Sequence, residues 1–120
     1  MSKFVCVCGH VISDVQYPST TDSTMLSETS LAEVLSYAGN VLTALRDADQ
    51  SGSRREWINR HFDPQYPQDA TDGEILEDSI SQKINDLALC VVRCASCGRL
   101  HVQQRNGVNE YASYVPDVSR

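Results

Sequence analysis

Two cysteine pairs, one near each end of the chain, are the residues best suited to carry chemistry. Cys6-x-Cys8 lies in FVCVCGHVISD, and Cys94-x-x-Cys97 lies in VVRCASCGRLHVQ. A tetrahedral Zn²⁺ site needs four soft donors that converge on one point, and one tight turn can supply two thiolates. A glycine follows each pair directly, and glycine adopts a positive φ without steric cost. The spacing therefore predicts one structural Zn²⁺ ion per chain, held by four cysteines.

Other uses of these cysteines stay open at this point. They could be buried thiols without a metal, or Cys94 and Cys97 could form a redox pair, although no thioredoxin-like βαβ context surrounds them. His10 or His101 could replace one cysteine ligand, since both lie beside the pairs. Cys90 shares strand parity with Cys94 and is expected in the core. A closed four-cysteine site leaves no coordination position for water or substrate, so the metal is expected to be structural.

Strands are expected on both sides of each cysteine pair, because β-branched residues flank the pairs. Asn106-Gly107 is a strong hairpin-turn signal. Residues 17–29 are rich in serine and threonine and are expected to form an irregular connection. The expected strands are a hairpin over residues 4–15 and strands at 89–93, 100–104 and 110–115.

Helices are expected between the two cysteine pairs. A first helix should begin at Ser30 and end at Ser51-Gly52, a short one should follow from Ser53, and a third should end near Ala88. Gly39 costs about 1 kcal/mol relative to alanine inside a helix, so close packing is expected there. The predicted capping boxes are Ser30-x-x-Glu33, Ser53-x-x-Glu56 and Thr71-x-x-Glu74. The apolar face expected on the first helix comprises Leu31, Val34, Leu35, Ala38, Val41, Leu42 and Leu45.

These elements predict an α+β fold. Two β hairpins that face one another across a metal form a zinc ribbon, and here the two halves, about residues 3–16 and 89–116, come from the two chain ends. A helical segment at about 28–88 is expected as an insertion between the halves, within a single domain of residues 1–120.

Charge is distributed unevenly along the chain. The net charge is −6 and the isoelectric point is about 4.8. Residues 14–86 hold 14 acidic and five basic side chains, whereas the flanking ends are net positive. A negative field repels nucleic acid and attracts basic proteins. No apolar run approaches the roughly 20 residues of a membrane span, and the N-terminus lacks a signal-peptide pattern, so a cytoplasmic protein without membrane contact is expected.

An acidic loop and helix start carry the candidate partner surface. Acidic and aromatic side chains beside a proline-containing loop are typical of a surface that binds a basic protein, and plain solubilising charge is the alternative. The candidate residues are Trp57, Asp63, Tyr66, Asp69, Asp72, Glu74, Glu77 and Asp78.

Catalysis is not expected. His61 lacks a recognisable nucleophile and orienting partner, and the chain has no nucleophile elbow, phosphate-binding loop or zinc-deaminase motif. Arg54, Arg55 and Arg60 form a small basic cluster that we expect to be solvated or paired with nearby carboxylates.

The two ends of the chain together resemble small bacterial zinc-ribbon proteins that are encoded beside polymorphic toxins and look like immunity proteins. The match is confined to F-x-C-x-C-G with I-S-D at one end and C-x-x-C-G-R-L with Y-x-x-Y-x-P at the other. The matching residues are Phe4, Cys6, Cys8, Gly9, Ile12, Ser13, Asp14, Cys94, Cys97, Gly98, Arg99, Leu100, Tyr111, Tyr114 and Pro116.

The resemblance implies a protein that binds and neutralises one cognate toxin domain without catalysis. An acidic inhibitor suits a basic toxin domain, because opposite charge raises association rate and specificity. The alternative function is a zinc-ribbon adaptor that binds nucleic acid or belongs to the transcription machinery. The acidic charge makes nucleic acid the less favourable partner.

Overall fold

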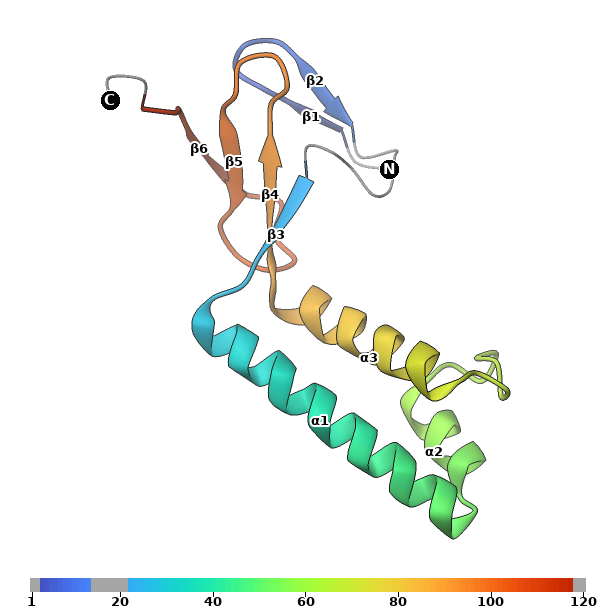
Figure 1. The fold of residues 1–120 in the computed structure, drawn as a ribbon. Coiled ribbons are helices and arrows are strands. Elements are labelled where there is room, and N and C mark those ends of the chain that lie inside the picture. The colour runs from blue at the N-terminus through green and yellow to red at the C-terminus, as the bar shows by residue number, and fades with distance from the viewer. Residues whose placement is uncertain (1–2, 14–21, 118–120) are drawn as a thin grey trace. The chain divides into compact units, whose positions relative to one another are not determined.

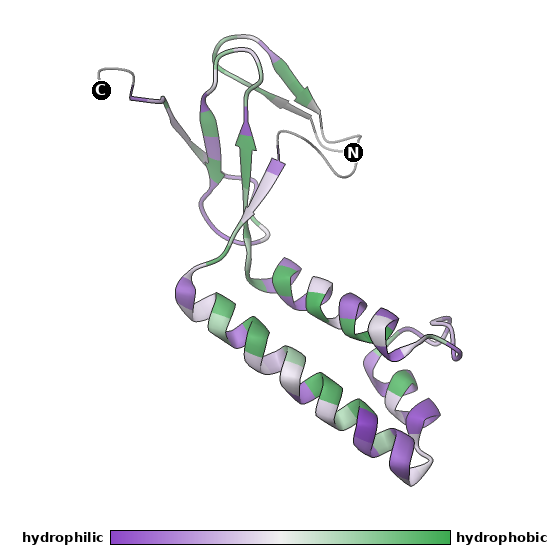
Figure 2. Cartoon of the chain, viewed as in Figure 1, coloured by the Kyte–Doolittle hydropathy of each residue, from purple (hydrophilic) through white to green (hydrophobic). Residues whose placement is uncertain are grey.

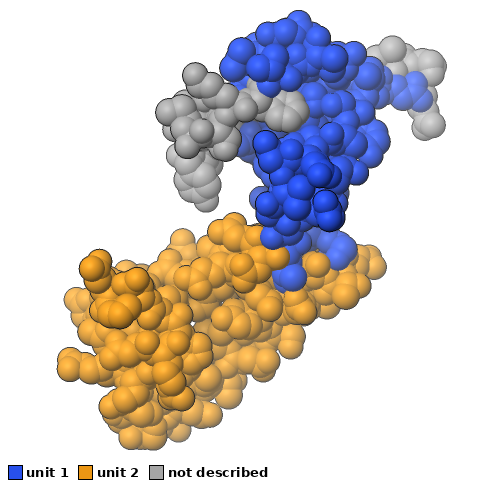
Figure 3. Space-filling view, turned by 180° about the vertical axis from the view of Figure 1, so that it is seen from behind, with its two compact units in different colours: residues 1–27, 87–120 blue, residues 28–86 orange. Residues whose placement is uncertain are grey.

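The chain divides into two compact units. The computed structural model describes residues 3–13 and 22–117. One unit, here called the strand unit, comprises Met1–Ser27 and Leu87–Arg120, and the other, the helical unit, comprises Glu28–Asp86 (Figure 3). The fold is α+β, as the sequence predicted, with strands from both ends of the chain and helices between them.

The strand unit contains two antiparallel sheets (Figure 1). The cysteine segments each connect two paired strands, as expected from the flanking β-branched residues. The first sheet pairs β1 (Lys3–Val5) with β2 (Val11–Ser13). The second has the order β3-β4-β5-β6, with β3 at Asp22–Met25, β4 at Leu89–Arg93, β5 at Leu100–Gln103 and β6 at Tyr111–Tyr114.

The core of the strand unit is built around cysteines. Cys6, Ile12, Val92 and Cys94 form one buried cluster, against which Cys90 packs. Alternate residues of β4 face this cluster, because successive side chains of a strand point to opposite sides. The predicted core position of Cys90 is therefore consistent with its packing here.

Strand β3 corrects the expected irregular connection. Residues 22–25 pair antiparallel with β4, and Met25 lies opposite Leu89. The segment DSTM has no apolar alternation, so its strand conformation comes from pairing with β4 rather than from a local pattern. Residues 14–21 of the expected connection lie outside the described residues.

The helical unit consists of α1 (Glu28–Ser51), α2 (Arg54–His61) and α3 (Asp72–Leu87). Each helix turns part of its apolar surface toward one core, and Figure 2 shows the green apolar residues along the helices. None of the described helices is long and apolar enough to cross a membrane. The buried members of this core are Val41, Leu45, Ala48, Trp57, Ile58, Ala70 and Ile75.

The three predicted capping boxes have different outcomes. The Thr71 box forms, since the Glu74 N–H donates to Thr71 Oγ1 at 3.1 Å and Glu74 Oε1 accepts from the Thr71 N–H at 3.1 Å. Ser53 precedes α2 as predicted, but its side chain makes no capping hydrogen bond. The box at Ser30 is wrong as a helix start, because α1 already begins at Glu28.

The predicted apolar face of α1 is only partly buried. Leu31, Leu35 and Leu42 are 46%, 65% and 37% exposed, whereas Val41 and Leu45 lie in the core. Close packing at Gly39 was also expected, but apart from the adjacent residues and the backbone of its own helix turns, a Cβ at this glycine would meet no described atom within 4 Å. Contacts among the described residues therefore do not account for the glycine.

Candidate metal centre

The sulfur atoms of the four paired cysteines converge on one point. The Sγ atoms of Cys6, Cys8, Cys94 and Cys97 all lie within 4.8 Å of one another. Cys6 Sγ is 3.6 Å from Cys97 Sγ, and Cys8 Sγ is 3.7 Å from Cys94 Sγ. Sulfurs about 2.3 Å from a tetrahedral Zn²⁺ ion lie about 3.8 Å apart, whereas a disulfide needs about 2.05 Å. The spacing fits four ligands of a single metal ion.

The first cysteine turn is closed by two backbone hydrogen bonds. The Cys6 N–H donates to the His10 carbonyl at 2.9 Å, and the Gly9 N–H donates to the Cys6 carbonyl at 2.8 Å. Gly9 has φ +94°, a conformation that a side chain disfavours. The glycine therefore lets the chain reverse directly after the second sulfur.

The second cysteine turn repeats the same pattern with one more residue between its cysteines. The Cys94 N–H donates to the Arg99 carbonyl at 2.9 Å, and the Gly98 N–H donates to the Cys94 carbonyl at 2.9 Å. Gly98 has φ +80°. Two turns with matching hydrogen bonds thus present their sulfurs to each other, as the sequence predicted.

Backbone N–H groups favour the thiolate form in the second turn. The Arg99 N–H lowers the pKa of Cys97 to about 6, and Arg99 Nη1 donates to the same sulfur at 3.5 Å. Burial opposes ionisation of Cys94, but the N–H groups of Cys97 and Ser96 outweigh it, so the pKa of Cys94 is also lowered. The part played by Arg99 was not predicted, although a basic residue two positions after a ligand is a usable signal.

Cys6 holds its proton more tightly when no metal is bound. The Cys8 N–H favours the thiolate, but burial and the hydrogen bond to Cys97 outweigh it and raise the pKa of Cys6 to about 11. A cation bound between the sulfurs replaces that proton, because only thiolates act as ligands. The tetrad can therefore hold one soft metal ion with all four positions filled by protein.

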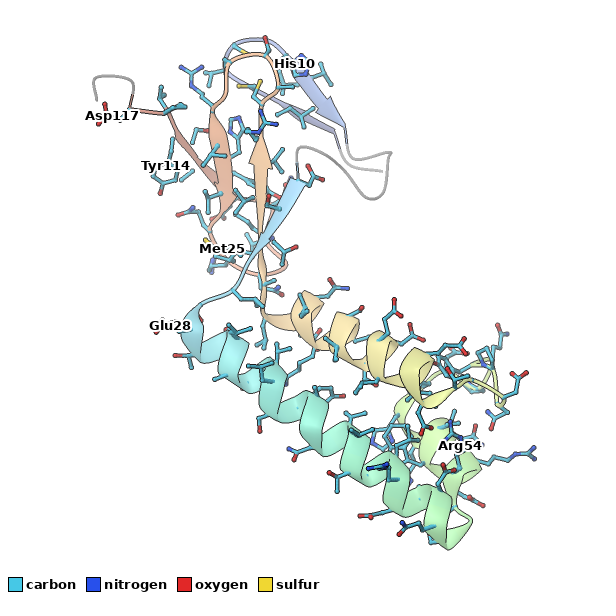
Figure 4. The ribbon with its side chains drawn as sticks, viewed as in Figure 1. His10, Met25, Glu28, Arg54, Tyr114 and Asp117 are labelled. Carbon is cyan, nitrogen blue, oxygen red and sulfur yellow. The ribbon has the colours of Figure 1, made fainter. Side chains whose placement is uncertain are left out.

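The histidines near the turns are not among the converging ligands. His10 is exposed, and His101 is buried on β5 with its Nδ1 2.7 Å from Ser113 Oγ (His10 is labelled in Figure 4). Burial lowers the pKa of His101, so its ring is uncharged at neutral pH. Among the described residues, the group with metal-ligand geometry consists of cysteines alone.

Several residues of the predicted partner surface serve the fold of the helical unit. Arg54 Nη1 donates to Asp72 Oδ1 at 2.7 Å and to Asp49 Oδ2 at 3.2 Å, and Arg54 Nη2 donates to the Ala70 carbonyl at 2.8 Å (Figure 4). Arg54 is therefore paired, one of the two states expected for the basic cluster. Glu74 is used by the capping box, and its bonds to the Thr71 N–H and hydroxyl lower its pKa.

Aromatic rings stack in a row across α2 and the loop that follows. The ring centroids of Trp57 and His61 are 4.2 Å apart, and those of Phe62 and Tyr66 are 4.1 Å apart. The Tyr66 hydroxyl donates to Asp78 Oδ2 at 2.6 Å, and burial together with this carboxylate raises the pKa of Tyr66 to about 12. His61 Nδ1 lies 2.8 Å from the Trp57 carbonyl and donates to it.

The remaining predicted surface residues differ in exposure. Trp57 is only 6% exposed and belongs to the core. Asp63 is exposed and accepts the Gln65 N–H at 2.9 Å, which fixes the start of the loop. Asp69 and Glu77 are exposed. The structure thus places this group within one unit but assigns intrachain contacts to more than half of it.

Charge is segregated between the two units. The helical unit holds 12 acidic and five basic side chains, a net charge of −7. The strand unit holds four acidic and five basic side chains, a net charge of +1. The negative field of the protein therefore originates in the helical unit.

Paired strands from both ends of the chain, a cysteine tetrad and an inserted helical unit define a small α+β protein with a candidate metal centre. The chain belongs to the family described as domain of unknown function (DUF8617), whose match spans residues 2–118. No curated protein and no solved structure matches the chain. The resemblance to immunity proteins therefore stays a prediction.

Proposed function

We propose that this chain is a non-catalytic binding protein whose tetrad holds one structural Zn²⁺ ion and whose helical unit recognises a basic protein surface. The observation that carries the proposal is the segregation of charge, −7 in the helical unit and +1 in the strand unit. A metal with four protein ligands leaves no position for substrate, so it suits a scaffold. The negative charge then lies on the helical unit, which contributes no ligand to the metal-binding scaffold.

Zinc is the metal that the tetrad suits best. Thiolates select soft ions, and four thiolates at tetrahedral spacing are typical of structural zinc sites. Two short sulfur–sulfur distances of 3.6 and 3.7 Å and the N–H groups aimed at the sulfurs support this assignment. Elemental analysis of the purified full chain should find one zinc per chain, and a metal-free chain whose strand unit stays folded would contradict the assignment.

The partner that we propose is a basic bacterial toxin domain. The likeness of the cysteine segments to immunity proteins supports this finer assignment, and the charge of the helical unit supports it independently. Opposite charge steers association and excludes partners of like charge. Asp69 and Glu77 are the exposed carboxylates of the predicted surface that are best placed to contribute.

Co-purification from the native host tests the proposed partner class. The full chain would carry a tag without histidines, and the proteins eluted at moderate salt would be identified. A single basic polypeptide at equal stoichiometry is the expected result. Nucleic acid or subunits of the transcription machinery in the eluate would favour the adaptor function instead and would overturn the toxin assignment.

Isosteric charge removal tests whether the helical unit recognises the captured partner. Glu77→Gln should lower the association rate by a few-fold at low salt and by less at high salt, because steering is screened by ions. Glu110→Gln is the matched control, since Glu110 is exposed on the strand unit and forms only a surface ion pair with Arg105 at 3.7 Å. Equal effects of the two substitutions would place recognition elsewhere.

A further inference from the structure

Helix α1 carries an apolar face that the described structure leaves uncovered. Leu31, Leu35 and Leu42 are 46%, 65% and 37% exposed and lie within about 40° of one another around the helix. The core-facing stripe of the same helix contains other residues, such as Val41 and Leu45. The three exposed leucines together with Gly39 are called the α1 leucine face below.

Gly39 lowers the stability of helix α1, and no packing contact with other described residues compensates for that loss. Glycine inside a helix destabilises it by about 1 kcal/mol relative to alanine. Apart from the adjacent residues and the backbone of its own helix turns, no described atom lies within 4 Å of the position that a Cβ would take, so no packing contact in the described structure requires its absence. A missing side chain beside exposed leucines suits the close approach of another helix.

Two charged residues on the same face have a self-complementary spacing. Glu28 and Arg46 are 18 residues apart, which is five helical turns, so they share one line along α1 about 27 Å apart. They are too distant to pair with each other. Both are exposed, and neither forms an ion pair with any other described residue (Glu28 is labelled in Figure 4).

We propose that the α1 leucine face binds a second copy of this chain, with the two α1 helices antiparallel about a two-fold axis level with Tyr37. Tyr37 is the midpoint between Glu28 and Arg46, so each Glu28 lies opposite the Arg46 of the other copy. The same axis brings Leu35 level with Gly39 of the other copy. The two-fold operation thus forms two ion pairs and places a leucine beside each glycine.

This self-association is independent of the proposed toxin binding and should be weak. The face offers three partly exposed leucines on each copy, so the buried area falls at the low end of specific interfaces. The helical unit carries −7, and its self-repulsion opposes association. The dimer should therefore appear within a concentration range of about 5–500 µM and should strengthen as salt is added.

Charge-swapped variants provide the test, measured by sedimentation velocity on the full metal-loaded chain. Glu28→Arg and Arg46→Glu each place like charges opposite each other, and each should weaken the dimer about tenfold or more. An equimolar mixture of the two variants restores both pairs and should dimerise at least as well as the original chain. Only this interface in this register predicts that recovery.

A glycine substitution separates the interface from helix stability. Gly39→Gln adds a good helix former where no described atom obstructs it, so the helical circular dichroism should be maintained or increased. The added side chain should nevertheless weaken the dimer, because it fills the space that Leu35 of the other copy uses. A chain that stays monomeric throughout this range would overturn the proposal. A dimer that ignores both the charge swap and Gly39→Gln would overturn it equally.

Discussion

Removing the metal should unfold the strand unit and leave the helical unit folded. The buried cluster of the strand unit has four members, and two of them, Cys6 and Cys94, belong to the tetrad. Ile12 and Val92 alone remain in that cluster, and burying each contributes about 1.5–3 kcal/mol. A structural zinc ion contributes about 10–16 kcal/mol in small domains. A zinc ion held by the tetrad would therefore be the largest single stabilising contribution to this unit.

The helical unit has a core of its own, so it should survive chelation. Seven buried residues form its cluster, and none of them is a cysteine. Two-dimensional amide NMR during titration with a chelator would follow both units at once. Dispersed strand signals should collapse while helical signals and the ellipticity at 222 nm remain. A metal-free chain that keeps its dispersed strand signals would refute the reasoning.

A pair of cysteine substitutions provides the matched comparison. Cys94 is fully buried within the tetrad, whereas Cys90 packs against the same cluster four residues away without belonging to the tetrad. Cys94→Ser should lose the metal and the strand signals. Cys90→Ser should keep one metal per chain and cost about 1 kcal/mol of stability. Equal damage from both would show that packing, rather than metal binding, stabilises the unit.

Three further perturbations test the helical unit by urea unfolding. Thr71→Ala should cost about 1 kcal/mol by removing the cap of α3. Folding lowers the pKa of Glu74, so the stability that its bonds to Thr71 contribute is present above pH 4.5, the ordinary pKa of this group, and is lost as pH falls below that value. Tyr66→Phe should cost about 0.5–1.5 kcal/mol. The pKa of Tyr66 is raised to about 12, so the stability that it contributes is complete below pH 10 and is lost as pH rises toward 12. Arg54→Ala should cost about 1–2 kcal/mol, because it removes bonds to two carboxylates and one carbonyl.

Exposed residues of the same types are the controls for the arginine and tyrosine substitutions. Arg55 is exposed, so Arg55→Ala should change stability by less than about 0.5 kcal/mol. Tyr114 is 55% exposed, and Tyr114→Phe should likewise be close to neutral (Figure 4). A control that destabilises as much as its test substitution would contradict the contacts assigned to the helical unit.

The sequence alone was sufficient to predict the features that depend on residues close to one another along the chain. Strand β4, the helix that follows the Thr71 box, and both cysteine turns were predicted, because turn glycines, caps and apolar spacing act locally. The convergence of the four cysteine sulfurs was also predictable, since two thiolate pairs on two turns suit few roles other than binding one metal ion. Strand β3 was missed because its conformation depends on pairing with a strand more than 60 residues away.

The partner surface shows where charge patterns mislead. Asp72 and Asp78 were assigned to an interface, yet each accepts a hydrogen bond from a side chain of the same unit. Composition alone cannot distinguish a carboxylate that contacts a binding partner from one that accepts hydrogen bonds within its own unit. The exposed leucines of α1 were predicted as part of one apolar face, but helical periodicity gives the spacing of a face and not how much of its width is buried.

The ion pair between Glu33 and Lys83 has a consequence for how the two cysteine turns meet. Cys8 and Cys94 are 86 residues apart, and the entropy lost on closing a flexible loop grows with the logarithm of its length. Once the helices fold, Glu33 lies 3.8 Å from Lys83, so the flexible chain between the turns shortens to about 36 residues. That shortening lowers the closure cost by about 0.8 kcal/mol. Because the helical unit is synthesised before Cys94, it can fold first and act as a tether that brings the later sulfurs to the earlier ones.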